Sequence, residues 1–228
     1  SGYAFSTDDY AFYSGAGTYT LTPEFEHPYF IASPASAEIT FADDMNNVTV
    51  QDFCIVPDGI HNDAEITFIP TTVARPGFDA KYRLVYKNKG NTTLSGDIVL
   101  NYADDVLDFI SASITPDNQS TGTLTWNYSN LAPFESSFID IILNVNSPVE
   151  TPPVDIDDIL TFIANIQHTA TEETPNDNTT TLRQTVVGSY DPNDKTCLEG
   201  ERILPEMVGE YLHYVIRFEN TGTYPAEN

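Results

Sequence analysis

Positive charge is scarce in this 228-residue chain, and the scarcity limits the partners that it can have. Nine lysines and arginines stand against 34 aspartates and glutamates, which gives a formal net charge of −25 at pH 7. A surface this acidic repels phosphate backbones and anionic lipid headgroups. The sequence therefore predicts no nucleic-acid partner, and the acidity first of all favours solubility in an exposed setting.

Long apolar runs are also missing. The longest strand-like run, near Ile139–Val145, is far shorter than a membrane span, so no membrane insertion is expected. No signal peptide is present and the chain begins with Ser-Gly, which indicates an internal fragment of a longer exported protein. Only two cysteines occur, Cys54 and Cys197. They lie far apart in sequence, which favours separate thiols, although export would permit a disulfide between them.

Motifs for catalysis are absent. The chain has no His-Glu-x-x-His, no Gly-x-Ser-x-Gly, no glycine-rich phosphate loop and no Cys-x-x-Cys. Its four histidines are scattered without metal-ligand spacing, and a pair of Cys54 with His61 would lack an orienting third group. The sequence therefore predicts no catalytic residue, and a protein that is not an enzyme.

Strand-forming residues are plentiful instead: thirteen Tyr and thirteen Phe accompany fifteen Pro and twelve Gly. Helical spacing occurs only in 154–166, where Leu160, Phe162 and Ala164 also alternate, and the β-branched content favours a strand. Elsewhere alternation dominates, with turn signals every eight to twelve residues between 64 and 187. We therefore predict an all-β fold of antiparallel β-sandwich modules in tandem, with an immunoglobulin-like central domain. Trp126, the only tryptophan, is expected in its core.

Three domains are predicted. Residues 1–60 hold strand-like segments at 17–23, 29–31, 38–41 and 48–55, too few for a sandwich, and are interpreted as the C-terminal part of another β-module. Residues 61–187 form the central sandwich. Segment 76–90 aligns without gaps on 208–222, so 188–228 is interpreted as the incomplete start of a second immunoglobulin-like repeat. Such a piece should be poorly packed on its own.

These segments resemble known modules. Residues 75–77, 82–90, 124–126 and 130–135 resemble the conserved-repeat immunoglobulin-like domains of bacterial surface proteins. The junction Val187-Gly188-Ser189-Tyr190-Asp191-Pro192-Asn193-Asp194-Lys195, followed by 214–222, resembles a module common in Bacteroidetes proteins exported by type IX secretion. Gly17–Pro23, Ser33–Ser36 and Asp52-Phe53 are similar to the end of a transthyretin-like module of the collagen-adhesin B type.

The resemblance implies a secreted, extracellular protein of the bacterial cell surface that serves as a stalk or adhesin without catalysis. Its expected partners are the neighbouring modules of the same chain, other copies and surface glycans. The rival interpretation is a carbohydrate-binding accessory module of a secreted polysaccharide-degrading enzyme. That function needs aromatic side chains in one exposed plane, for which the candidates are Tyr3, Tyr10, Phe12, Tyr13 and Tyr29. The same clustering is typical of a truncated core.

Calcium is the candidate ligand. Asp191, Asn193 and Asp194 offer a compact set of oxygen ligands in the junction after the central domain, although Lys195 breaks the EF-hand pattern. An ion here would fix the angle between consecutive modules. Two further acidic clusters lie at 155–158 and 172–177. For each cluster the alternative is a turn in which an Asp side chain hydrogen-bonds its own backbone.

Overall fold

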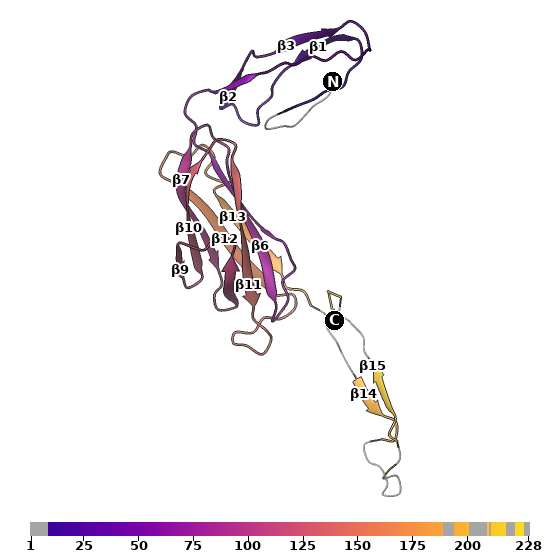
Figure 1. Cartoon of the computed structure of the whole chain (residues 1–228). Helices are drawn as coiled ribbons and strands as arrows, with labels where there is room; N and C mark the ends of the chain where they lie inside the picture. The colour runs from indigo at the N-terminus through magenta and orange to yellow at the C-terminus, as the bar shows by residue number, and fades with distance from the viewer. Residues whose placement is uncertain (1–8, 189–193, 201–208, 210, 218–221, 226–228) are drawn as a thin grey trace.

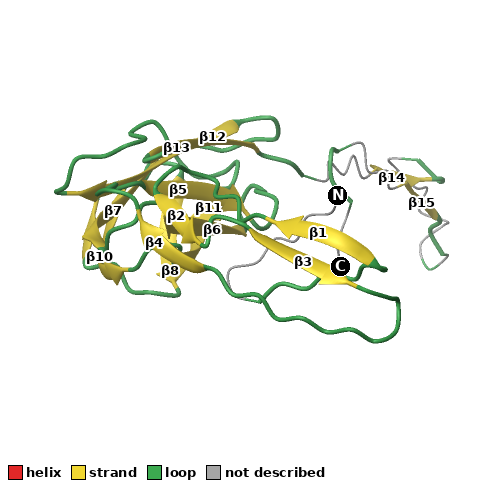
Figure 2. Cartoon of the chain, turned by 90° about the horizontal axis from the view of Figure 1, so that it is seen from above, coloured by secondary structure: helices red, strands yellow, loops and turns green. Residues whose placement is uncertain are grey.

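The computed structural model describes residues 9–188, 194–200, 209, 211–217 and 222–225. Every regular element in these ranges is a β-strand (Figure 2). Short paired strands lie at the N-terminal end, a sandwich follows, and a further two-stranded ribbon lies beyond it (Figure 1). The predicted fold class, all-β with an antiparallel sandwich at its centre, is confirmed. Within the described ranges no helix is long and apolar enough to cross a membrane.

Two antiparallel sheets make the sandwich. The first has the order β5-β6-β11-β8 and the second β13-β12-β7-β10-β9. Their bounds are β5 Ala64–Pro70, β6 Asp79–Asn88, β7 Leu94–Tyr102, β8 Leu107–Ala112, β9 Asn118–Ser120, β10 Thr123–Leu131, β11 Ser136–Val145, β12 Ile159–His168 and β13 Thr179–Thr185. The pairs β5–β6, β9–β10 and β12–β13 stay within one sheet, whereas the other connections between consecutive strands cross from one sheet to the other. These crossings link the two layers in addition to the core.

The core between the sheets follows the alternation of the sequence. In β12, Leu160 and Phe162 are buried whereas Ile159 and Ile163 are exposed, so the stretch has the period of a strand, as predicted, and not that of a helix. Trp126 is 2% exposed, and its indole Nε1 donates a hydrogen bond of 2.8 Å to the carbonyl of Ile114. The prediction that Trp126 belongs to the core is therefore confirmed.

The N-terminal part consists of two ribbons. β1 (Gly17–Leu21) pairs with β3 (Ala37–Phe41), and β2 (Phe30–Ser33) pairs with β4 (Cys54–Pro57). The strand predicted over 48–55 is wrong, because β4 begins only at Cys54 and its partner β2 is four residues long. Val48 and Val50 are 88% and 81% exposed, so alternating valines without a partner strand do not make a strand here.

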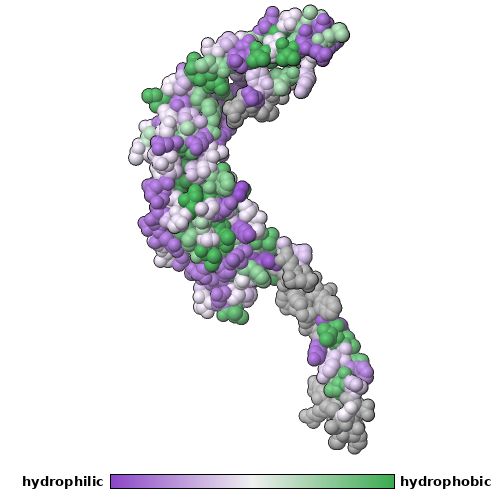
Figure 3. Space-filling view, in the orientation of Figure 1, coloured by the Kyte–Doolittle hydropathy of each residue, from purple (hydrophilic) through white to green (hydrophobic). Residues whose placement is uncertain are grey.

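Beyond the sandwich, β14 (Asp194–Cys197) pairs with β15 (Tyr214–Arg217). All four residues of β15 are exposed, and hydrophobic residues lie at the surface of this ribbon (Figure 3). The described residues of this part thus have the poor packing expected of an unfinished module. The division into three domains and the tandem repeat remain predictions.

Candidate functional site

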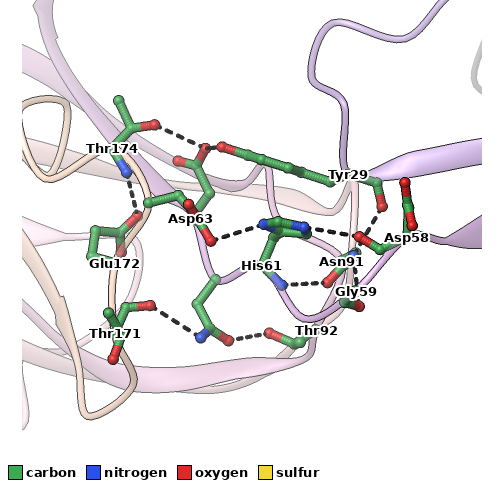
Figure 4. Close-up of polar contacts among 12 residues, drawn as sticks. Tyr29, Asp58, Gly59, His61, Asp63, Asn91, Thr92, Thr171, Glu172 and Thr174 are labelled. Carbon is green, nitrogen blue, oxygen red and sulfur yellow. Dashed lines mark hydrogen bonds and ion pairs between the residues drawn. The ribbon is translucent and has the colours of Figure 1, made fainter.

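The N-terminal ribbons are fastened to one end of the sandwich by a network of polar side chains, which we call the joint (Figure 4). It comprises Tyr29, the linker 58–63, the loop 88–92 that follows β6, and the loop 171–174 that follows β12. These four segments are distant in sequence. Because they meet at one place, the joint positions the N-terminal ribbons on the sandwich.

Asn91 is central to the joint. Its buried side chain donates from Nδ2 to the carbonyls of Tyr29 (2.9 Å) and Gly59 (3.3 Å) and accepts at Oδ1 from the backbone N–H of His61 (2.8 Å). The backbone N–H of Asn91 donates in turn to the carbonyl of His61 at 2.9 Å. One amide therefore holds the approach to β2, the linker and the sandwich together.

Gly90 allows this close approach. A Cβ at this position would lie 2.4 Å from the carbonyl oxygen of His61 and 2.7 Å from the backbone nitrogen of Asp63. The N–H groups of Lys89 and Gly90 both donate to the carbonyl of Asp63, at 2.7 and 3.1 Å. Only a residue without a side chain lets the loop and the linker pack backbone to backbone.

The linker ends at a buried carboxylate. Asp63 is fully buried, and its Oδ2 accepts hydrogen bonds from the Tyr29 hydroxyl (2.9 Å) and the Thr174 hydroxyl (3.2 Å). Its Oδ1 has no hydrogen-bond partner among the described residues. Burial raises the pKa of Tyr29 above its usual value, and donation of its proton to Asp63 adds to the rise. Tyr29 thus stays protonated and keeps its hydrogen bond to Asp63.

Aromatic rings reinforce the polar contacts. Tyr29 stacks between His27 and His61, with centroids 5.2 and 4.5 Å away and planes within 15°. His61 Nε2 lies 2.8 Å from the carbonyl of Asp58, and Nδ1 lies 2.8 Å from the Glu173 carboxylate. Phe30, at the start of β2, stacks on Phe134 of the sandwich at 4.4 Å. The two units are therefore joined by ring contacts as well as hydrogen bonds.

The loop after β12 closes the joint from the other side. Asn62 donates from Nδ2 to the carbonyl of Thr171 at 3.0 Å, and its own carbonyl accepts from the N–H of Glu173 at 2.9 Å. The carboxylates predicted here as a possible ion cluster are divided among separate partners. Glu173 faces His61, Glu172 is bonded to His168, and Asp177 pairs with Lys89 at 2.7 Å. They do not converge on one point.

The predicted calcium site falls largely outside the described residues. Asp191 and Asn193 are not among them, and for Asp194 the structure describes only the backbone, as the first residue of β14. In the cluster at 155–158, the Asp158 carboxylate accepts from the N–H of Asp155 at 2.8 Å, which is the turn-forming role weighed above. Within the described ranges, no group of three or more His, Cys, Asp or Glu side chains could hold a metal ion.

The aromatic residues considered for sugar binding do not share a plane. Tyr3 lies outside the described residues, and Tyr29 is buried in the joint and not exposed. Tyr10 and Phe12 are partly exposed, with ring planes 59° apart, and Tyr13 is fully exposed. Cys54 is exposed and both cysteines are free, as the spacing favoured. The joint was not predicted from the sequence, where its loops between 64 and 187 indicate only turns.

Only the C-terminal part of the chain matches a family model. Residues 191–228 match a family described as a domain of unknown function, DUF7619. No curated protein matches the sequence.

Several solved structures are similar to this chain, all at low sequence identity and low TM-score. The CARDB domain of the PF1109 protein from Pyrococcus furiosus, solved in complex with di-metal ions, is 18% identical, with a TM-score of 0.40, over 65% of this chain and 100% of that one. CaCohA2 from Clostridium acetobutylicum is 12% identical, with a TM-score of 0.35, over 55% and 92%. The major pilin subunit BcpA of Bacillus cereus is 10% identical, with a TM-score of 0.36, over 91% and 69%.

Proposed function

We propose that this chain is a non-catalytic structural or adhesive part of a large secreted protein of the bacterial cell surface, where it acts as a stalk or spacer. The observation that carries the proposal is the joint, in which Asn91 alone bonds the N-terminal part, the linker and the sandwich. A spacer transmits position only if consecutive units keep a fixed angle. Buried, mutually bonded polar groups impose such an angle because each has its partners in a single arrangement.

The same proposal includes the ion site. Asp191, Asn193 and Asp194 follow the sandwich directly, so calcium bound there would stiffen the next connection in the chain. A ligand that binds only the folded protein raises the unfolding midpoint as its concentration increases. We expect calcium to raise the midpoint measured in EDTA, and the double variant D191A/D194A to lose that rise. The double variant D155A/D158A, which changes another acidic cluster, is the control. If calcium raised the unfolding midpoints of D155A/D158A and D191A/D194A equally, calcium binding at this site would be excluded.

The fixed angle is directly testable by distance measurement. Cys54 is an exposed thiol in the N-terminal part, and Ser111 is an exposed residue of β8 in the sandwich. Spin labels on Cys54 and on S111C, with Cys197 replaced by Ser, report the separation of the two units by double electron–electron resonance. We expect a single narrow distance distribution in the parent protein.

The joint itself is tested by one substitution and one control. N91A removes the three side-chain bonds of Asn91 and should broaden the distribution. N127A changes an exposed asparagine of β10, on the sandwich surface, and should leave it unchanged. A broad distribution in the parent protein would contradict the spacer function.

A carbohydrate-binding accessory module of a secreted polysaccharide-degrading enzyme is the alternative. It has less support, because the candidate aromatics lie in different planes and Tyr29 belongs to the joint. Retention of the parent protein on an insoluble polysaccharide, lost in the double variant Y10A/F12A, would favour this alternative.

A further inference from the structure

The two outer faces of the sandwich differ sharply in charge. On the face of β5-β6-β11-β8, β6 presents Lys81, Arg83 and Lys87 outward, and Arg83 forms a bidentate ion pair with Asp140 of β11. The face of β13-β12-β7-β10-β9 bears almost no charge: its outward side chains are chiefly Thr, Asn and Ser, and Asp97 and Arg183 are its charged members. In a chain with a net charge of −25, such a surface is unusual.

The uncharged residues form regular rows across the second sheet. Strand register places Thr181, Ile163, Asn101 and Thr123 in one row, on four adjacent strands. The next row contains Thr179, Asn165, Val99 and Thr125 in the same order. We call these eight side chains the neutral face. Ile163 is 41% exposed, so the rows include apolar as well as polar contact area.

Four polar side chains of the neutral face are paired with each other. The Thr179 hydroxyl donates to Asn165 Oδ1 at 2.7 Å, and the Thr123 hydroxyl donates to Asn101 Oδ1 at 3.1 Å. A polar group that keeps a hydrogen bond when it is buried loses less free energy than one left without a partner. The face can therefore be covered by another surface without leaving these groups unsatisfied.

We propose that the neutral face is a contact surface for a second copy of this chain, packed face to face about a twofold axis. Charge selects this partner. Two copies repel each other through their acidic surfaces, and the neutral face is where they can approach without opposing like charges. A self-complementary patch is what a twofold contact requires, because each residue row meets the same rows of the other copy.

The size of the surface agrees with this assignment. The strands β13, β12, β7, β10 and β9 hold 7, 10, 9, 9 and 3 residues. Each residue adds about 3.3 Å along a strand, and neighbouring strands lie about 4.8 Å apart. The sheet face thus offers on the order of 600 Å², which is at the low end of one partner's share of a specific interface. Because the face has few apolar side chains, we expect a weak contact that becomes effective when many copies stand side by side. The proposal adds a partner to the stalk function and can fail while the joint remains rigid.

Salt gives the first test, by sedimentation equilibrium of the parent protein over a range of concentrations. Salt screens the repulsion between the two acidic molecules, so dimerisation through the neutral face should strengthen as ionic strength rises. Docking of the basic row of β6 onto an acidic surface would instead weaken with salt. A monomer at every concentration and salt level, or an association that salt weakens, would overturn the proposal.

Two near-isosteric substitutions give the second test. N101D/N165D keeps the oxygen that accepts from Thr123 and Thr179 but places negative charges on both copies at the contact. T67D/S111D adds the same charge to exposed positions on the opposite sheet. We expect at least a tenfold weaker dimer for N101D/N165D and a much smaller change for T67D/S111D, with equal unfolding midpoints. Unchanged association of N101D/N165D, as expected if the exposed ribbon β14–β15 were the contact, would also overturn the proposal.

Discussion

At the scale of single residues, the joint depends on side chains that stabilise it through the partners that they meet there, and not through the kind of residue alone. Asp63 is a carboxylate without exposure, and two hydroxyls from opposite sides of the joint supply its hydrogen bonds. Tyr29 supplies one of them and stacks on His61 as well. A buried charge that loses a donor has no water to replace it, so the joint should be sensitive to small changes at Tyr29.

Replacing Tyr29 by Phe tests this sensitivity. The ring stack remains, but Asp63 loses the 2.9 Å bond, and a hydrogen bond to a charged group is worth about 1.5–3 kcal/mol. We expect the free energy of unfolding to fall by about that amount in urea titrations. Y19F, which removes an exposed hydroxyl bonded to the carbonyl of Gly15, should change it by less than about 0.5 kcal/mol. Equal losses of unfolding free energy in Y29F and Y19F would mean that the buried hydrogen bond to Asp63 stabilises the protein no more than an exposed one.

At the scale of elements, the sequence is informative where one strand can be considered by itself. Alternation of Leu160, Phe162, Ala164 and Ile166 predicts which side of β12 is buried, and the structure confirms it. Alternation fails for Val48 and Val50, because a strand also needs a partner and none is available there. The joint could not be predicted from the sequence for a related reason. Each of its loops, taken alone, has the sequence pattern of a polar turn. Whether these loops contact one another depends on the packing of all the strands that lie between them in the chain.

Pairing of β7 with β12 has one feature that alternation does not show. Gly96 of β7 faces His168 at the end of β12, and a Cβ there would lie 1.8 Å from the carbonyl oxygen of Gln167. We expect G96A to force the two strands apart at this end and to lower the free energy of unfolding by about 3 kcal/mol, the upper range for overpacking. T161A, at an exposed position of β12, is the control. If G96A had the same free energy of unfolding as the unsubstituted protein, the strand ends could separate without destabilising the sandwich.

At the scale of the whole molecule, stability rests on one core that contains ionisable rings. Burial raises the pKa of Tyr82 far above its usual value, and it raises those of Tyr102 and Tyr128 to about 12. In Tyr102 the nearby charge of Asp104 adds to this effect. Each ring is therefore neutral in the folded protein at a pH where it would ionise in the unfolded chain, which has the ordinary tyrosine pKa of about 10.

The sign of the pH dependence follows from these shifts. Below about pH 10 the rings are protonated in both states, and their contribution to stability is fully present. Above that pH the unfolded chain binds fewer protons than the folded one, so stability is lost as pH rises towards 12 and beyond. The three core rings should ionise only together with unfolding. Ultraviolet absorbance of tyrosinate, followed alongside circular dichroism, shows whether the two events coincide. Complete ionisation of all the tyrosines while the strand signal is still intact would show that the core admits solvent, and that the sandwich is not the rigid body that a spacer needs.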